Sequence, residues 1–285
     1  MRGLRRPGFA PWVLWSAALA ATLWLAEVAH PVRAAASVPP GVQSYFFLVF
    51  SDPAPGTEAE YNRWYDNEHG PDVTSIPGFV SARRYVYAEQ QLREVALKKP
   101  KYLILYRIVT DDPAAVRREI ERRAGNGMTR QSPTLTNVKM YTYRAFRPEV
   151  MGAGGDASDA RPGPKQTYLQ VVFGDAVQGM DQAFNDWYDQ VHEPDMLKVP
   201  GFVKAQRGIL SEFQMAPTDE GPSQSRYLAL FEIQTSDLAA VLRGNKGGAE
   251  PIAAFDRTRT FGYTYRAIGP VMVGDDIRAE RSKSR

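Results

Sequence analysis

Two of the chain's three histidines stand at equivalent places in a repeated segment. His69 and His192 each follow an aspartate by three residues, within the pattern Trp-Tyr-Asp-x-x-His. An imidazole oriented by a carboxylate can take a proton from a phenol or from an activated carbon acid near neutral pH. We therefore expect His69 and His192 to be catalytic acids or bases, oriented by Asp66 and Asp189.

Other polar residues recur in both copies and could contact a substrate. The asparagines lie one helical turn before the aspartates, where an amide could stabilise a developing oxyanion. The arginines lie in a later strand and could contact an anion or pair with a carboxylate of the fold. Alternate residues of a strand share a face, so each tyrosine points with a second tyrosine two residues before it, toward a cavity or away from it. These candidates are Asn62, Asn185, Arg84, Arg207, Tyr143 and Tyr265.

The repeated segment also admits a purely structural role. Tyr61, Trp64 and Tyr65 follow the i, i+3, i+4 spacing of one helical face, which is typical of a packed core. Asp66 and His69 could equally fasten the end of the helix to the Pro-Asp turn that follows. Both roles stay open at the level of sequence.

Motifs for bound cofactors are missing. The sequence shows no Gly-rich loop after a strand, no histidine or carboxylate spacing for a metal, no nucleophile elbow and no cysteine. We therefore expect no cofactor and no metal site. Haem is the one group left open, because a single imidazole can serve as its axial ligand.

Four blocks of sequence occur twice in the same order. Residues 61–72 match 184–195, 76–80 match 199–203, 102–105 match 227–230, and 141–145 match 263–267. A duplication of this kind decides the architecture. We predict a first repeat over 37–150, a Gly-, Ala-, Asp- and Pro-containing linker over 151–165, a second repeat over 166–273, and a polar C-terminal tail over 274–285.

The periodicity within one copy gives the order of its elements. It predicts strands over 44–50, 79–88, 101–109 and 139–146, and helices over 57–69 and 112–124. The order βαββαβ is that of the ferredoxin-like unit, in which both helices cover one face of a four-stranded antiparallel sheet. The two copies can cover their bare faces by packing sheet to sheet. We predict an α+β fold in which two such repeats form an intramolecular barrel.

The repeated blocks resemble a known superfamily. Trp64-Tyr65-Asp66-x-x-His69-x-Pro71-Asp72 through Pro77-Gly78-Phe79, together with the second copy, is similar to the dimeric α/β-barrel superfamily, nearest to its EthD-like members. The resemblance covers nearly all of the chain after the N-terminal segment. It implies the barrel fold. Because that superfamily includes cofactor-free monooxygenases, polyketide cyclases, lyases, isomerases and haem enzymes, it implies no single reaction.

The N-terminal residues 1–36 have the pattern of a signal peptide. Three arginines precede an apolar run over 13–25, and Ala-Ala-Ala ends the segment. This predicts a periplasmic or secreted protein that contacts membrane only if the segment stays uncleaved. Removing 1–36 takes away four arginines and one glutamate, so the formal charge of +3 becomes zero (3 − 4 + 1). A neutral chain lacks the basic surface that nucleic acid requires, so we expect no nucleic-acid partner.

Differences between the copies limit the symmetry. The loop over 212–224 differs in composition from its counterpart over 89–99 and could cover one of the two sites. The two sites therefore need not be equally active.

Three functions remain in view, all on a small hydrophobic or aromatic ligand. The first is a cofactor-independent enzyme that works by histidine-mediated proton transfer, as a lyase, isomerase or cyclase. The second is an EthD-like oxidoreductase, cofactor-free or haem-dependent. The third is a non-catalytic binding protein. A homodimer of the whole chain is a further possibility.

Overall fold

The computed structural model describes residues 41–92, 100–152, 163–216, 225–245 and 250–283. The predicted signal peptide and most of the predicted linker lie outside these residues, so both stay predictions. None of the described helices is long and apolar enough to cross a membrane.

Both copies fold in the predicted βαββαβ order, with the first helix of each divided into three parts. The first copy contains β1 (Gln43–Pro53), α1 (Glu58–Trp64), the π-helix η1 (Tyr65–His69), α2 (Gly70–Thr74), β2 (Phe79–Tyr87), β3 (Tyr102–Thr110), α3 (Pro113–Gly125) and β4 (Leu135–Ala145). The second contains β6 (Gln166–Gly174), α4 (Asp181–Trp187), η2 (Tyr188–His192), α5 (Glu193–Lys198), β7 (Phe202–Leu210), β8 (Tyr227–Thr235), α6 (Leu238–Gly244) and β9 (Phe261–Val273). A short strand, β5 (Val150–Met151), follows the first copy, and α7 (Gly274–Lys283) follows the second.

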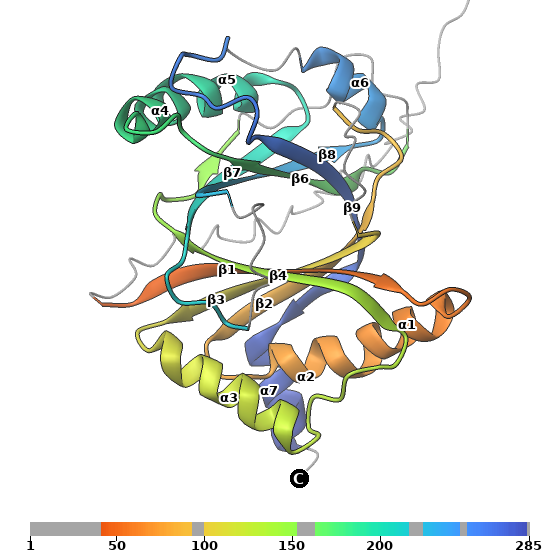
Figure 1. The fold of residues 1–285 in the computed structure, drawn as a ribbon. Helices are drawn as coiled ribbons and strands as arrows, with labels where there is room; N and C mark the ends of the chain where they lie inside the picture. Colours follow the sequence, from red (N-terminus) through yellow and green to blue (C-terminus); the bar gives the residue numbers. More distant parts are fainter. Residues whose placement is uncertain (1–40, 93–99, 153–162, 217–224, 246–249, 284–285) are drawn as a thin grey trace, which may run out of the picture. The chain divides into compact units, whose positions relative to one another are not determined.

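The strands of the two copies form one closed antiparallel barrel. Their order is β4-β1-β3-β2-β9-β6-β8-β7-β5, and β4 also pairs with β7. One seam joins β2 to the second half of the long strand β9, and the other joins β4 to β7. Figure 1 shows the two four-stranded halves facing each other, with helices on their outer faces. The predicted fold of two ferredoxin-like repeats packed sheet to sheet is confirmed.

Alternation along the strands separates the barrel interior from the helix-covered faces. In β1, Phe46, Leu48 and Phe50 belong to the interior cluster, whereas the odd-numbered residues between them pack under the helices. Tyr143 and Tyr265 are fully buried in the interior cluster together with Tyr141 and Tyr263. The tyrosine face of each last strand therefore points into the barrel, which the sequence had left open.

The Trp-Tyr-Asp-x-x-His segment forms a π-helical turn in both copies. Tyr65–His69 and Tyr188–His192 are the two π-helices, each continuous with an α-helix on either side. A π-helix closes i→i+5 hydrogen bonds, so its turn is wider than an α-helical turn. Residues three apart are then spread farther around the axis than the predicted α-helix would place them. The expected Asp–His pairs assumed the narrower α-helical spacing.

The polar C-terminal segment predicted over 274–285 contains a helix, α7. Arg278 in α7 donates to the backbone carbonyls of Thr74, Ile76 and Phe79 at 3.4, 3.3 and 3.1 Å. Arg281 in the same helix pairs with Asp72. The last carbonyls of a helix lack internal partners, and Arg278 supplies one to Thr74 at the end of α2 and others to two carbonyls of the turn that follows.

Candidate functional site

The repeated asparagine, aspartate and arginine form one network in each copy. Arg84 donates to Asp66 Oδ1 at 2.5 Å and to Asn62 Oδ1 at 2.6 Å. Arg207 pairs in the same way with Asp189, and donates to Asn185 Oδ1 at 2.7 Å. Of the two roles considered for these arginines, the structure shows the pairing with a carboxylate of the fold. The network joins the helical segment to the second strand of each copy.

The expected pairing of aspartate with histidine is corrected by this network. Asp66 and Asp189 turn toward Arg84 and Arg207, because the π-helical turn places them on a different side from the histidines. The carboxylates that act on the imidazoles are instead Asp72 for His69 and Asp195 for His192. Asp66 and Asp189 are therefore positioning groups for the arginines.

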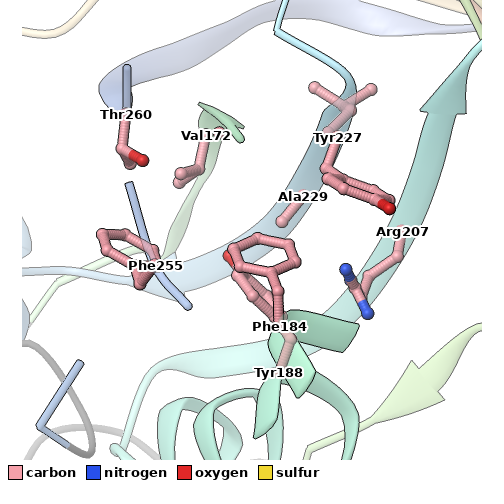
Figure 2. Close-up of a pocket in the computed structure, with 10 residues that line it drawn as sticks. Val172, Phe184, Tyr188, Arg207, Tyr227, Ala229, Phe255 and Thr260 are labelled. Atoms are coloured by element: carbon pink, nitrogen blue, oxygen red, sulfur yellow. The ribbon is translucent and has the colours of Figure 1, made fainter. Parts of the chain in front are cut away.

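Arg207 lies among aromatic rings. Its guanidinium carbon is 4.3 Å from the centre of the Tyr188 ring and 4.9 Å from that of Phe146. Figure 2 shows Arg207 beside Tyr188, Phe184 and Tyr227. A cation placed over ring faces is stabilised by their electron density, which offsets part of the cost of burying it. Tyr188 of this cage also contacts His192, with ring centres 4.7 Å apart.

Both histidines are stacked on the tryptophan of their motif. The ring centres of His69 and Trp64 are 4.4 Å apart, and those of His192 and Trp187 are 4.8 Å apart. Burial lowers the pKa of each imidazole to about 4; the Arg207 charge adds to this for His192, while Asp72 and Asp195 oppose it. Each is therefore neutral at pH 7. In both rings, Nδ1 is buried without a hydrogen-bond partner among the described residues.

A cavity of about 220 Å³ lies against His192 in the second copy. It occupies the space between the sheet and the helical segment that carries the motif. Its polar lining residues are Gln170, His192, Arg257 and Thr260. Its apolar lining includes Leu92, Val172, Trp187, Met196, Phe231, Pro251, Phe255 and Phe261. A concave, mostly apolar site with a few polar groups is typical of a small-molecule site.

Gln170 is the site residue that the sequence reasoning missed. Its side chain is 3% exposed, and its Oε1 has no hydrogen-bond partner among the described residues. Gln170 pairs with Thr264 and Phe47 with Thr142 in the register of the two copies, so Phe47 is its counterpart. A glutamine at a strand position that is phenylalanine in the other copy was the available signal. An unsatisfied buried amide is costly unless something binds it.

The corresponding place in the first copy is filled. Met215, from the loop after β7 of the second copy, is 1% exposed in the core of the first copy, with Phe213 and Ala216 packed beside it. Gln214 holds this loop in place by hydrogen bonds to the Thr142 backbone at 2.8 and 3.0 Å. The described part of the predicted lid is therefore a plug over the first site. The hydrogen bond of His69 to the Arg130 backbone further occupies its ring.

The two candidate tyrosines lie away from both histidines. Tyr143 donates its hydroxyl to the Ser225 carbonyl at 2.7 Å, and Tyr265 donates to the Pro100 carbonyl at 3.1 Å. Both side chains are buried in the barrel interior, on the opposite face of the sheet from the cavity. The structure places them as core residues. Among the described residues, no cluster of three or more His, Asp or Glu side chains could hold a metal ion.

Comparison with known proteins gives a likeness of fold only. No protein-family model and no curated protein matches the chain. Among solved structures, an anthrone oxidase-like protein is 14% identical over 81% of this chain and 93% of its own, with a TM-score of 0.46. A putative monooxygenase from Fusobacterium nucleatum (10% identity; 81% and 94%; TM-score 0.48) and a mutant chlorite dismutase from Candidatus Nitrospira defluvii (14%; 84% and 95%; 0.42) are also similar. At these values the likeness carries no argument about chemistry, and the fold rests on the strand pairing itself.

Proposed function

We propose that the second repeat holds the active site of an exported enzyme that exchanges a proton between His192 and a small hydrophobic or aromatic molecule. The proposal depends on one observation: two polar groups without hydrogen-bond partners belong to residues that line the same apolar cavity. His192 and Gln170 both line it, and neither the imidazole Nδ1 nor the amide Oε1 has a partner among the described residues. A ligand that forms hydrogen bonds with these two groups would be stabilised by contacts that the empty site lacks.

The chemistry follows from the state of His192. With a pKa of about 4 the imidazole is neutral, so it can accept a hydrogen bond from a hydroxyl or an acidic C–H. Burial opposes an isolated imidazolium, but an enolate or phenolate formed beside the ring would pair with it and offset that cost. Proton transfer is therefore coupled to formation of the anion in the cavity. Arg257, an exposed residue of the cavity lining, adds positive potential to the cavity in which the anion would form.

The cavity also restricts what can bind. Its volume of about 220 Å³ lies below the roughly 300–1,000 Å³ typical of drug-sized ligand sites. One or two fused rings fit the aromatic walls, whereas a porphyrin is larger than the described space. The residues present therefore do not fit haem, although one neutral imidazole is available.

Two reaction classes share this proton transfer. A lyase, isomerase or cyclase would return the proton to another atom of the same molecule. A cofactor-free oxidation begins with the same deprotonation, and the EthD-like resemblance of the motif supports it as the second candidate. The same His192 and the same cavity serve both, so the proton-transfer step is tested first.

Exchange of solvent deuterium into 2-tetralone tests the step without knowledge of the natural substrate. This two-ring ketone has an activated C–H and fits the proposed class, and NMR records the loss of its α-proton signal in D₂O. We expect the wild-type chain to accelerate exchange above buffer, and His192→Gln to lower the rate by roughly 100-fold or more. The matched variant His69→Gln should leave the rate unchanged.

Two other outcomes are decisive against the proposal. Equal rates for wild type and His192→Gln would remove His192 as the proton acceptor. Saturable binding of 2-tetralone without exchange would favour the non-catalytic binding protein.

A further inference from the structure

We propose that the barrel interior holds a second ligand site, which binds a short-chain carboxylate on Arg83. A cavity of about 150 Å³ lies at one end of the barrel, on the opposite face of the sheets from His192. Its charged lining residues are Arg83, Arg107, Lys204 and Glu232, contributed by both repeats. The inference does not rest on the proposed proton transfer, because the two cavities have no lining residue in common.

The cavity lies where equivalent positions of the two copies meet. Arg83 pairs with Leu105 in the register of the first copy, and Gln206 pairs with Leu230 in that of the second, so Arg83 and Gln206 are counterparts. By the same register Arg107 corresponds to Glu232. Both members of each pair line the cavity. At these equivalent positions the first copy therefore has two arginines, whereas the second copy has a glutamine and a glutamate.

The other charged groups of the cavity form ion pairs within the protein. Lys204 lies 3.3 Å from Glu232 and 3.6 Å from Glu149, and Arg107 lies 3.5 Å from Glu149. Arg83 has no ion pair or hydrogen bond with any described residue, and its Nε is buried. Arg83 is partly buried, and its buried Nε donor has lost water without gaining an acceptor, which is unfavourable. Arg83 is therefore the surplus cation of the cavity.

The surroundings select the class of anion. The planar guanidinium matches a carboxylate in a two-bond arrangement. Leu105, Leu169 and Leu230 line the same cavity and offer apolar contact to a short carbon chain. The wall carboxylate of Glu232 disfavours a doubly charged phosphate more than a singly charged acid. Tyr85 also lines the cavity, within electrostatic reach of Arg83, Arg107 and Glu232.

Calorimetric titration of the full chain with sodium butyrate tests the site. Butyrate has no ring, so it avoids the aromatic cavity of the second repeat. We expect butyrate to bind the wild-type chain. Arg83→Gln, which introduces the residue found at the equivalent position Gln206, should raise the dissociation constant roughly 10–100-fold. The matched control Arg118→Gln, at an exposed arginine of α3, should bind as wild type does, and so should His192→Gln.

A second variant keeps the test open if Arg83→Gln does not fold. Gln206→Glu retains Arg83 and adds an internal carboxylate to the wall, so it should compete with butyrate and abolish the heat. In wild type, the ¹⁵N signal of an arginine Nε should shift on addition of butyrate and should be missing in Arg83→Gln. Unchanged butyrate binding in Arg83→Gln, or no heat at millimolar butyrate, would overturn the inference. Tighter binding of inorganic phosphate than of butyrate would overturn the carboxylate assignment.

Discussion

The two repeats share a motif and a fold but differ in what fills the space beside the histidine. In the first, Phe47 and Met215 occupy the region between sheet and helix, and His69 is hydrogen-bonded to the Arg130 backbone. In the second, Gln170 replaces the phenylalanine and a cavity lies against His192. The repeated histidine alone does not make a site. The groups opposite it decide whether a ligand can enter.

A large effect should come from the arginine network, whose two carboxylates differ in exposure. The Asp189 side chain is 20% exposed and that of Asp66 is 54% exposed. Arg207→Met leaves Asp189 only its ion pair with the half-exposed Arg147, and this carboxylate is more buried than that of Asp66, so we expect a loss of about 2–3 kcal/mol in the free energy of unfolding. Arg84→Met should cost about 1–2 kcal/mol, since water can reach Asp66. Urea unfolding measures both, and equal losses would contradict the assigned difference.

Removing the plug should make the first repeat more like the second. Met215 is fully buried, so Met215→Ala should lower the free energy of unfolding by about 2–4 kcal/mol and leave a cavity near His69. We expect a second equivalent of the two-ring phenol 2-naphthol to bind, as counted by calorimetry. Leu92→Ala, at the partly buried counterpart that packs against the second repeat, should cost about 1 kcal/mol or less and leave the stoichiometry unchanged. A stoichiometry of one in Met215→Ala would argue against a latent first site.

Exchanging the residues opposite the histidines tests whether they decide which repeat binds a ligand. Gln170→Phe should fill the cavity and weaken 2-naphthol binding roughly 10–100-fold, equivalent to about 1–3 kcal/mol. The reciprocal variant, Phe47→Gln, should leave binding unchanged and destabilise the fold by a similar amount, because it buries an amide in a packed core. Fluorescence titration and urea unfolding separate the two effects. Undiminished binding in Gln170→Phe would place the ligand elsewhere.

The smallest effect should be one that the repeats share. Each histidine has a folded pKa of about 4 against an ordinary value of 6.5, so the unfolded chain binds protons first as pH falls. Their contribution to stability is complete above pH 6.5 and is lost as pH falls toward 4, by about 1–2 kcal/mol per histidine at pH 5. Glu193 acts oppositely, since burial raises its pKa to about 6 and its contribution declines as pH rises from 4.5 to 6.

The measurement is urea unfolding at pH 7.5 and pH 5. His69→Gln and His192→Gln should each lose less stability on acidification than wild type does, and by similar amounts. A bound phenol that donates to the neutral imidazole stabilises the unprotonated ring, so it should leave the acid sensitivity due to His192 undiminished. An acid response that neither variant changes would mean that the imidazoles are not buried as described.

The fold was predictable from the sequence because duplication supplied each element twice. The order of strands and helices follows from periodicity, and the closed barrel follows from two sheets that each leave one face bare. The Asp66–His69 pair was wrong because i+3 spacing was treated as α-helical, whereas the segment adopts a π-helical turn. The choice between the histidines could not be made, since it depends on Met215 reaching the first copy from a loop of the second.

The crossing loops have a consequence for how the molecule could change over time. Gln214 reaches from the second repeat to Thr142, and Gln91 reaches from the first to Thr264, so each half contributes a segment to the other half's last strand. In a pair of identical subunits, any substitution in that loop would appear at both ends. A fused chain is free of this constraint. One loop can carry a methionine that fills the neighbouring site while the other carries Leu92, which lines the opposite cavity without filling it, so the two ends of a fused chain can change independently.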